Sequence, residues 1–387
     1  MQCVKNILNR YRILAALTLI AAVSTSTATA QNSIRNEIRI PDIRGYVTLK
    51  CDFHMHTVFS DGTVWPTERS NEIWREGLDV FSITDHIEYQ PHKSTMSTDH
   101  NVSYETAAPS AENLGMILIK GTEVTRAEPF GHHNAIFITD TAALAQPDSM
   151  VVLKTAKEQD GFVFWNHPGW KRPDRKGVWT VLQDEVYDSG CLDGIEVVNG
   201  RTYDPNAHAF AIEKKLTMLG NSDIHAPSTH VIDSSHRTMT LVFAKDRTAK
   251  AVKEALLKRR TAVYYDNIII GEEQYLKPIF MESTILRTPD ITVTGTGSTI
   301  VQITNDSDIP YTLESDGSTM DLAVPARIEL LANSTVRFAV RNTDITRKGT
   351  KKVRLGYKVT NLWTAPGECL SVEIPVKVTY ISGKAAK

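Results

Sequence analysis

Short apolar runs typical of β-strands alternate with amphipathic or polar stretches between residue 45 and about residue 265. Alternation of this kind predicts repeated β-α units around a largely parallel sheet. The seven runs predict an α/β barrel; they are Val47–Phe53, Val80–Thr84, Met116–Thr122, His133–Thr139, Phe162–Asn166, Gly194–Val198 and Leu216–Gly220. Helices are predicted where apolar residues recur at helical spacing, at Thr67–Glu76, Met150–Gln159 and Thr248–Arg260. The polar stretch Tyr89–Asn113 predicts a long loop with about one helical turn.

The pattern changes after about residue 280, where helical periodicity disappears and β-rich segments follow one another. Several short strands without intervening helices predict an immunoglobulin-like sandwich. The expected strands are Thr299–Thr304, Ala326–Leu331, Val336–Val340, Val353–Val359 and Leu370–Tyr380. We therefore expect an α/β domain over residues 31–275 and a small all-β domain over residues 281–387.

The first thirty residues have the pattern of a cleavable signal peptide. Basic residues precede the apolar run Ile13–Val23, and Ala28-Thr29-Ala30 supplies the small-x-small signal before Gln31. The apolar run is too short to cross a bilayer comfortably, and no other stretch of 18 or more apolar residues occurs. The sequence predicts cleavage after Ala30, a periplasmic or secreted protein, and no membrane span.

Charge and cysteine content exclude several classes of function. The 43 Lys and Arg against 45 Asp and Glu leave a formal net charge of −2, which argues against a general nucleic-acid-binding surface. Only Cys51, Cys191 and Cys369 remain after cleavage, without CxxC spacing. A disulfide framework or a thiolate zinc site is therefore not expected. The sequence identifies no protein partner.

Histidines and carboxylates follow the predicted strands. His54 and His56 stand directly after the first strand at a spacing that points both side chains to one face. Because the carboxyl ends of barrel strands meet at one end of the barrel, residues far apart in sequence are expected to meet there. Each residue alone is more often structural, but the joint pattern predicts a site for divalent ions such as Zn, Mn or Fe. The candidate ligands are His54, His56, Asp61, His86, Glu123, His132 or His133, His167, Asp223 and His225.

These residues lie in segments that resemble successive motifs of the PHP (polymerase and histidinol phosphatase) superfamily, and in particular its secreted bacterial phosphodiesterases. The motifs are His54-x-His56-Thr57-x-x-Ser60-Asp61-Gly62, Thr84-Asp85-His86, Gly121-x-Glu123, Asn166-His167-Pro168, Glu196-Val197-x-Asn199 and Ser222-Asp223-x-His225. The resemblance covers about residues 45–270. It implies a distorted seven-stranded TIM-like barrel with up to three metal ions.

The resemblance also implies how the ligands divide among the ions. The first ion would take His54, His56, Glu123 and Asp223. The second would share Glu123 and add His132 and His167, and the third would take Asp61, His86 and His225. In Gly131-His132-His133-Asn134 either imidazole fits the motif, and we prefer His132.

The expected function is hydrolysis of a small anionic phosphodiester by a metal-bridged hydroxide at this trinuclear site. Asp223 is expected to orient the hydroxide, and His225 or His133 to donate a proton to the departing alkoxide. One alternative is a metal-dependent hydrolase of a phosphomonoester, a carbamate or a carboxylic ester. An alternative of another class is a module that binds metal or ligand without catalysis.

Basic residues after the strands are candidates for substrate binding. Lys171 and Arg172 follow the fifth strand and Arg201 follows the sixth, with Arg126 and Arg237 after the third and seventh. In an acidic chain such a local basic set predicts attraction of an anionic substrate. The alternative is a solvated polar loop.

Overall fold

The computed structural model describes residues 33–230 and 236–383. The predicted signal peptide, residues 1–30, lies outside the described residues. Within the described part, no helix combines the length and the hydrophobicity that a membrane crossing requires.

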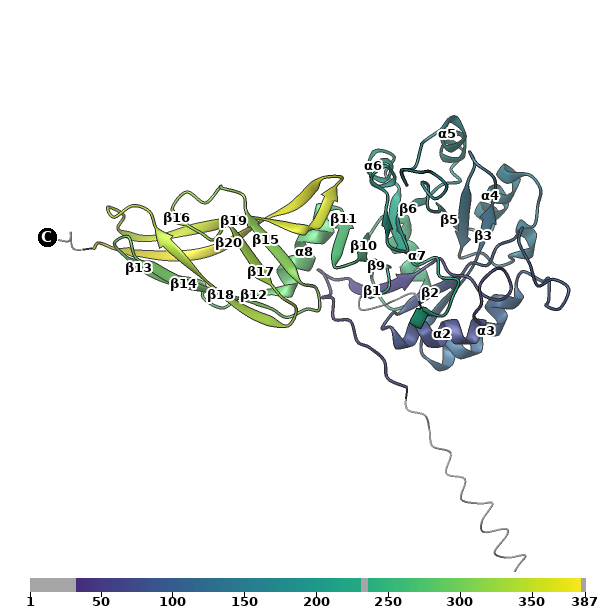
Figure 1. The fold of residues 1–387 in the computed structure, drawn as a ribbon, viewed down its shortest axis with the longest axis horizontal. Helices are drawn as coiled ribbons and strands as arrows, with labels where there is room; N and C mark the ends of the chain where they lie inside the picture. Colours follow the sequence, from purple (N-terminus) through teal and green to yellow (C-terminus); the bar gives the residue numbers. More distant parts are fainter. Residues whose placement is uncertain (1–32, 231–235, 384–387) are drawn as a thin grey trace, which may run out of the picture. The chain divides into compact units, whose positions relative to one another are not determined.

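Each of the seven predicted runs forms a strand of one mixed sheet, with an eighth strand beside the first (Figure 1). The hydrogen-bonded order is β9, β1, β2, β3, β4, β5, β6 and β8. The strands are β1 (Val47–Asp52), β2 (Val80–Ile83), β3 (Ile117–Thr125), β4 (His132–Ile136), β5 (Phe162–Trp165), β6 (Gly194–Asn199), β8 (Thr217–Asn221) and β9 (Met239–Ala244). A two-residue strand, β7 (Thr202–Tyr203), pairs with the end of β6.

The expectation of parallel pairing holds for only part of this sheet. β1, β2 and β3 are parallel, as are β5, β6 and β8, but β4 is antiparallel to both neighbours and β9 is antiparallel to β1. The connection from β3 to β4 is too short to hold a crossover helix, so the chain reverses there as a hairpin. No strand pairing joins β8 to β9 among the described residues; instead, the Thr240 hydroxyl donates to the Gly220 carbonyl at 2.9 Å. Closure of the sheet into a barrel is therefore not confirmed.

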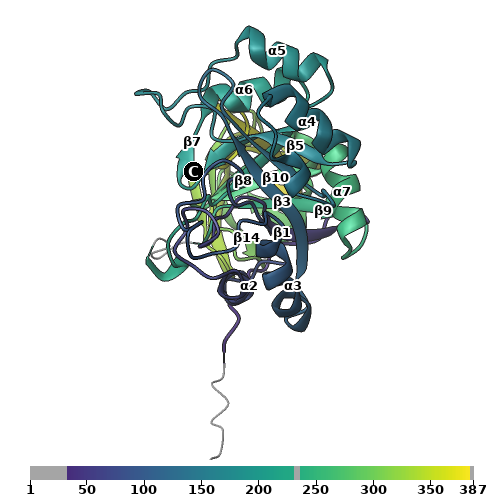
Figure 2. The ribbon, with the colours of Figure 1, turned by 90° about the vertical axis from the view of Figure 1, so that its right-hand side faces the viewer.

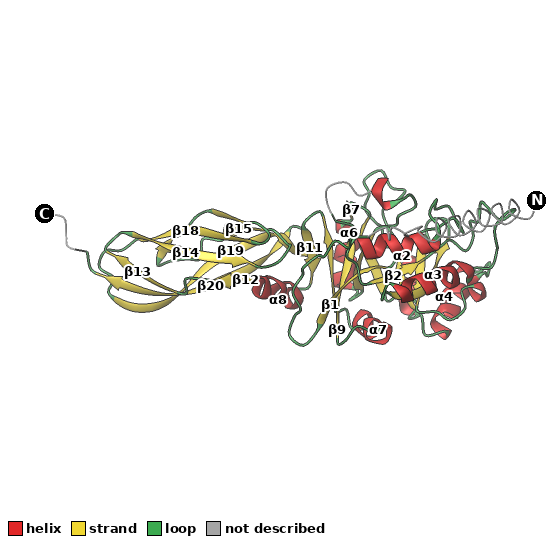
Figure 3. Cartoon of the chain, turned by 90° about the horizontal axis from the view of Figure 1, so that it is seen from below, coloured by secondary structure: helices red, strands yellow, loops and turns green. Residues whose placement is uncertain are grey.

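Helices lie outside the strands (Figures 2 and 3). The three predicted helices are present as α2 (Pro66–Arg75), α4 (Ser149–Glu158) and α7 (Ala249–Leu257). The structure also contains α5 (Val181–Asp188), α6 (Pro205–Glu213) and the short 3-10 turns η1 (Ala142–Leu144) and η2 (Ser228–His230). Side chains cap several helices: Asp148 accepts from the Val151 amide and Thr248 from the Ala251 amide. Such caps satisfy amides that the first helical turn leaves unpaired.

The prediction of a long loop at Tyr89–Asn113 is wrong in its second half. Residues Val102–Asn113 form the twelve-residue helix α3. Its buried face consists of Ser103, Ala107 and Ala111, which are four residues apart. Small residues allow the helix to pack closely but produce a weak hydrophobic pattern, so the helix was not apparent in the sequence.

The C-terminal part is built almost entirely of strands (Figure 3). It follows β10 (Thr261–Tyr265), β11 (Ile268–Gly271) and α8 (Glu273–Ser283). One group of strands contains β13 (Asp290–Thr294), β15 (Tyr311–Ser315), β17 (Arg327–Leu330), β19 (Gly349–Ala365) and β20 (Glu368–Ile381), and a second sheet contains β12 (Thr284–Leu286), β14 (Ser298–Asn305), β16 (Leu322–Ala323) and β18 (Ser334–Asn342). Buried and exposed residues alternate along β20, as expected for a strand with one face in a core.

Candidate metal centre

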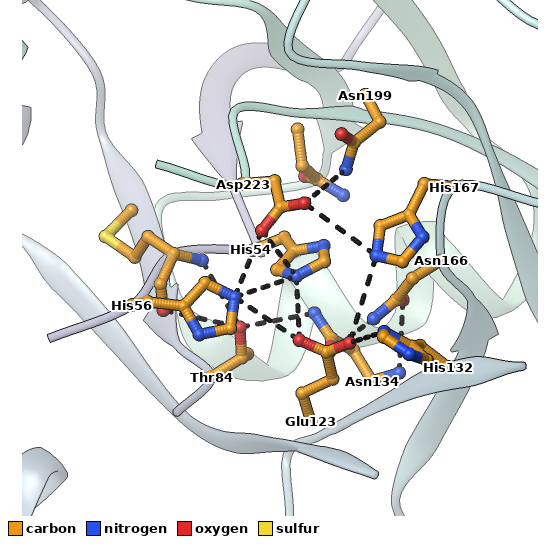
Figure 4. Close-up of polar contacts among 12 residues, drawn as sticks. His54, His56, Thr84, Glu123, His132, Asn134, Asn166, His167, Asn199 and Asp223 are labelled. Atoms are coloured by element: carbon orange, nitrogen blue, oxygen red, sulfur yellow. Dashed lines mark hydrogen bonds and ion pairs between the residues drawn. The ribbon is translucent and has the colours of Figure 1, made fainter. Parts of the chain in front are cut away.

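The ends of the strands bring the predicted ligands together, and Figure 4 shows His54, His56, Glu123, His132, His167 and Asp223 among them. His54 and His56 follow β1, and the segment between them forms a bridge with the segment after β8, where Met55 faces Ile224. The amide of Asp223 donates to the His54 carbonyl at 2.9 Å, which fixes Asp223 beside both histidines. A second bridge joins His86, after β2, to Glu123 in β3. Backbone hydrogen bonds between neighbouring strand ends therefore position the cluster.

Glu123 lies at the centre of the cluster and is fully buried. Its Oε2 lies 3.2 Å from His54 Nε2, 3.3 Å from His56 Nε2 and 3.2 Å from His86 Nδ1. Its Oε1 lies 2.7 Å from His132 Nδ1 and 3.9 Å from His167 Nε2. The two oxygens thus face different sets of imidazoles, which is the arrangement a bridging carboxylate needs.

Asp223 faces the same histidines from the opposite side. Its Oδ1 lies 3.1 Å from the Nε2 atoms of both His54 and His56, and its Oδ2 lies 3.7 Å from His167 Nε2. His167 and Asp223 both adopt positive φ angles, 28° and 52°. Non-glycine residues rarely adopt this conformation, and such strain concentrates at functional sites.

Asp61, His86 and His225 form the third part of the cluster. Asp61 Oδ1 lies 3.2 Å from His225 Nε2 and 3.4 Å from His86 Nε2. His56 Nδ1 is 3.8 Å from the same oxygen. His56 therefore lies close enough to join Asp61, His86 and His225, the three residues that the family resemblance assigns to the third ion.

The two adjacent histidines of β4 have different surroundings. His132 points to Glu123, whereas His133 is fully buried with its ring 4.8 Å from that of Phe130. Burial and the neighbouring His132 lower the pKa of His133 to about 3. This burial leaves no access for substrate, so the prediction of His133 as a proton donor is wrong.

The donor atoms fit divalent cations. Ligand atoms bound ~2.0–2.2 Å from one ion lie about 3 Å from each other, as most of these nitrogen and oxygen atoms do. Four of them are buried and face other ligand atoms of the cluster without a well-oriented hydrogen bond: Asp61 Oδ1, Glu123 Oε1, His132 Nδ1 and Asp223 Oδ1. Isolated buried polar atoms are costly, and bound cations would remove that cost. The residues present therefore fit the metal site that the sequence predicts.

The charges of the buried side chains also indicate a cation site. Burial lowers the pKa of His56, but hydrogen bonds to Asp223 and Glu123 outweigh burial and raise the pKa to about 9. Burial opposes ionisation of Glu123 and Asp223 too, yet the surrounding imidazoles hold the pKa of each carboxyl well below its usual range. The carboxylates thus require positive charge beside them, from protons or from metal ions.

Glu196 is a buried carboxylate that the sequence motifs contain but to which sequence reasoning assigned no role. One oxygen accepts from His54 Nδ1 at 2.9 Å, and the other accepts from the His167 amide at 2.8 Å. Asn199 donates to Glu196 at 2.9 Å and to Asp223 at 3.2 Å. Glu196 therefore contacts two of the candidate ligands directly, His54 and His167, and is linked to Asp223 through Asn199. A lone acidic residue inside the apolar strand β6 was the available signal.

The predicted substrate-binding residues differ in their surroundings. Lys171 and Arg172 are exposed on the loop after β5, and the Lys171 ammonium lies 4.8 Å from the centre of the Trp170 ring. Arg201 is exposed and forms an ion pair with Asp266 at 3.0 Å. Arg237 is instead buried between Asp52 and Glu76, at 3.0 and 2.6 Å, so its prediction as a substrate-binding residue is wrong. Arg126 pairs with Glu88.

Comparisons with known proteins agree with this architecture. A family model described as an Ig-like domain matches residues 286–375, and no curated protein sequence matches the chain. A two-domain protein from Bacteroides vulgatus, containing a predicted PHP-like metal-dependent phosphoesterase, is 41% identical with a TM-score of 0.84, over 90% of this chain and 100% of its own. A candidate metal-dependent phosphoesterase from Bifidobacterium adolescentis is 18% identical with a TM-score of 0.40, over 54% of this chain and 96% of its own.

The identity to the Bacteroides vulgatus protein, together with its full coverage, shows that this chain belongs to the PHP-like family of two-domain proteins. The predicted fold class, an α/β domain followed by an immunoglobulin-like domain, is confirmed.

Proposed function

We propose that this protein is a metal-dependent phosphoesterase that hydrolyses a phosphodiester. Membership of the PHP-like family supports phosphoester hydrolysis. The observation that carries the proposal is the position of Glu123, whose two oxygens face separate sets of imidazoles within one buried cluster. This arrangement suits adjacent cations rather than a single ion.

The proposed ligands are His54, His56, Asp61, His86, Glu123, His132, His167, Asp223 and His225, and they would hold up to three divalent ions. Zn, Mn and Fe suit this set of nitrogen and oxygen donors, which contains no thiolate. Bound cations of this kind supply an activated water nucleophile and neutralise charge on the phosphoryl oxygens. In the reaction, water adds to phosphorus, the bond to the alcohol oxygen breaks, and a proton ends on the alcohol.

Asp223 and His225 have distinct proposed roles in that reaction. Asp223 Oδ2 accepts from Asn199 at 3.2 Å, which holds the carboxylate in place to orient the attacking water. His225 Nδ1 lies 2.8 Å from the Asp223 carbonyl, so a neutral ring carries its proton there and leaves the Nε2 lone pair available to a cation shared with Asp61. This tautomer supports His225 as a ligand, and proton donation from His225 would require the imidazolium.

A panel of three nitrophenyl esters tests the proposal. Protein reconstituted separately with Zn, Mn and Fe should hydrolyse bis(4-nitrophenyl) phosphate with a higher kcat/KM than 4-nitrophenyl phosphate or 4-nitrophenyl acetate. Glu123→Gln should lose metal and activity together. Faster turnover of the monoester or the acetate would contradict the diester assignment, and a fully loaded protein inactive on all three would favour a binding module.

Export is also proposed, from the residue pattern of positions 1–30. Expression of the full chain in a Gram-negative host, followed by fractionation, should give a mature protein that begins at Gln31 outside the cytoplasm. Recovery of an uncleaved chain in the cytoplasm would contradict this.

A further inference from the structure

Large aromatic side chains are exposed at only three positions in the described part of the chain, and two of them, Tyr89 and Trp170, lie beside candidate metal ligands. Trp65, Tyr89 and Trp170 are 45%, 52% and 45% exposed. Every other exposed large hydrophobic residue in this part is aliphatic. Exposed aromatic surface is unfavourable in water, and its occurrence beside a polar site is typical of surfaces that bind ligands.

Trp170 lies against one side of the cluster. Its ring centre is 5.2 Å from that of His132 and 5.4 Å from that of His167. The loop holds it in place, because its amide donates to the His167 carbonyl at 2.8 Å and its own carbonyl accepts from Arg175 at 2.8 Å. The indole also forms one wall of a hollow that includes His167, Asn199 and Thr202.

Tyr89 lies at another side, with its ring centre 6.4 Å from that of His86. Its segment is anchored because the Ile87 amide donates to the Glu123 carbonyl at 3.0 Å, and Glu88 accepts from the Thr125 amide at 2.8 Å. Trp65 packs against Phe59, with 5.4 Å between ring centres. Trp170 and the segment of Tyr89 are therefore held by backbone hydrogen bonds to the ligand residues His167 and Glu123.

We propose that Trp170 and Tyr89 determine specificity by binding ring-bearing organic groups of the ester. This inference rests on the proposed function, because the phosphoryl group must occupy the metal centre for its substituents to reach these two rings. Aromatic faces bind flat rings by stacking and sugar rings through their apolar faces. The substrate class is thus a phosphoester with at least one ring-bearing alcohol rather than a simple alkyl ester.

Binding of non-hydrolysable phosphonates to the metal-loaded protein tests this directly. Isothermal titration should show phenylphosphonate binding at least about fivefold tighter than methylphosphonate, as expected from the typical effect of one stacked ring. Cyclohexylphosphonate distinguishes the two ring types: tight binding identifies a saturated, sugar-like ring, and weak binding identifies a flat aromatic ring. Both results support the inference.

Variants identify the residues that produce the selectivity. Trp170→Ala and Tyr89→Ala should each reduce the phenyl-to-methyl affinity ratio at least about threefold, while Trp170→Phe should retain most of it. The ratio cancels any general loss of phosphoryl binding, because methylphosphonate serves as the reference in each variant. Val181→Ala, which removes an exposed aliphatic side chain on α5, is the matched control and should leave the ratio unchanged.

Different failures have different meanings. Equal affinities for phenylphosphonate and methylphosphonate, or a ratio preserved in both alanine variants, would overturn the inference and leave the proposed function intact. Absence of binding by any phosphonate to fully loaded protein would contradict the phosphoryl site itself, and the inference with it.

Discussion

His54 Nδ1 lies 2.9 Å from Glu196 Oε1, and both side chains are fully buried. A carboxylate accepts but does not donate, so this contact places the proton of a neutral His54 ring on Nδ1. The lone pair on Nε2 then points toward Glu123 and Asp223, where a cation would be bound. The pair thus matches the carboxylate–histidine arrangement that commonly orients metal ligands.

Glu196→Ala should weaken metal binding by about 10- to 100-fold, because His54 loses its fixed orientation and the His167 amide loses its acceptor. Metal retained after dialysis against graded chelator concentrations, measured by elemental analysis, gives the change. Glu185→Ala, which removes an exposed carboxylate on α5, is the control. Unchanged metal retention in Glu196→Ala would exclude a positioning role.

In the metal-free protein, the free energy of unfolding should fall as the pH rises from 6.5 to 9.5. The folded pKa of His56 in the metal-free cluster is raised to about 9, above its ordinary value near 6.5. Such a group stabilises the fold fully below about pH 6.5, and that contribution, about 3 kcal/mol for one histidine, is lost as the pH rises through 9. Urea unfolding between pH 6.5 and 9.5 should show this decline in chelator-treated protein but not in metal-loaded protein. Parallel curves would contradict it.

The double substitution Lys171→Ala/Arg172→Ala should raise KM for an anionic ester by a few-fold and leave kcat nearly constant. Both side chains are exposed, so their charges act on the approach of the substrate rather than on the chemical step. The effect should shrink at high ionic strength, since salt screens exposed charges. A kcat and KM comparison at 20 and 500 mM salt measures it. Lys352→Ala, an exposed charge removed from β19, is the control, and an unchanged KM in Lys171→Ala/Arg172→Ala would reject a substrate-binding role.

The sequence was sufficient to predict the helices and strands whose local residue pattern matches the way they pack in the fold. α4 and α7 combine a side-chain cap with a clear apolar face, and the seven apolar runs all became strands. Strand direction was not predictable, because an apolar run such as β4 has the same pattern whether its neighbours run parallel or antiparallel to it. The helix α3 was missed because the small residues Ser103, Ala107 and Ala111 form its buried face.

The candidate ligands were visible in the sequence because most of them follow or end a strand, and strand ends converge in this kind of fold. His132 instead begins β4, which runs antiparallel to its neighbours. Roles that depend on distant partners were not visible. Arg237 resembled a substrate-binding residue until the structure placed Asp52 and Glu76 around it. Tyr89 and Trp170 stand in polar stretches of the sequence, but only the folded structure places their rings beside His86, His132 and His167.

Arg237→Ala should destabilise the fold by about 3–5 kcal/mol, because it leaves two carboxylates, Asp52 fully buried and Glu76 largely buried, without their cation. Chemical denaturation of the two proteins gives the difference. Arg354→Ala removes one partner of an exposed pair with Glu373 and should cost less than about 1 kcal/mol. A similar effect of both substitutions would show that the buried network contributes little.

His208 should reduce stability on the acid side of neutrality. Burial lowers the pKa of this histidine to about 4, while its Nδ1 lies 3.0 Å from the Tyr203 hydroxyl. The unfolded chain therefore binds a proton below pH 6.5 that the folded chain excludes, and stability falls by up to about 3 kcal/mol as the pH drops from 6.5 to 4. His208→Gln cannot take up that proton, so its free energy of unfolding should decline less over this range in urea titrations. The exposed His92→Gln should follow the parent protein, and a His208→Gln curve that also follows it would show that His208 titrates normally.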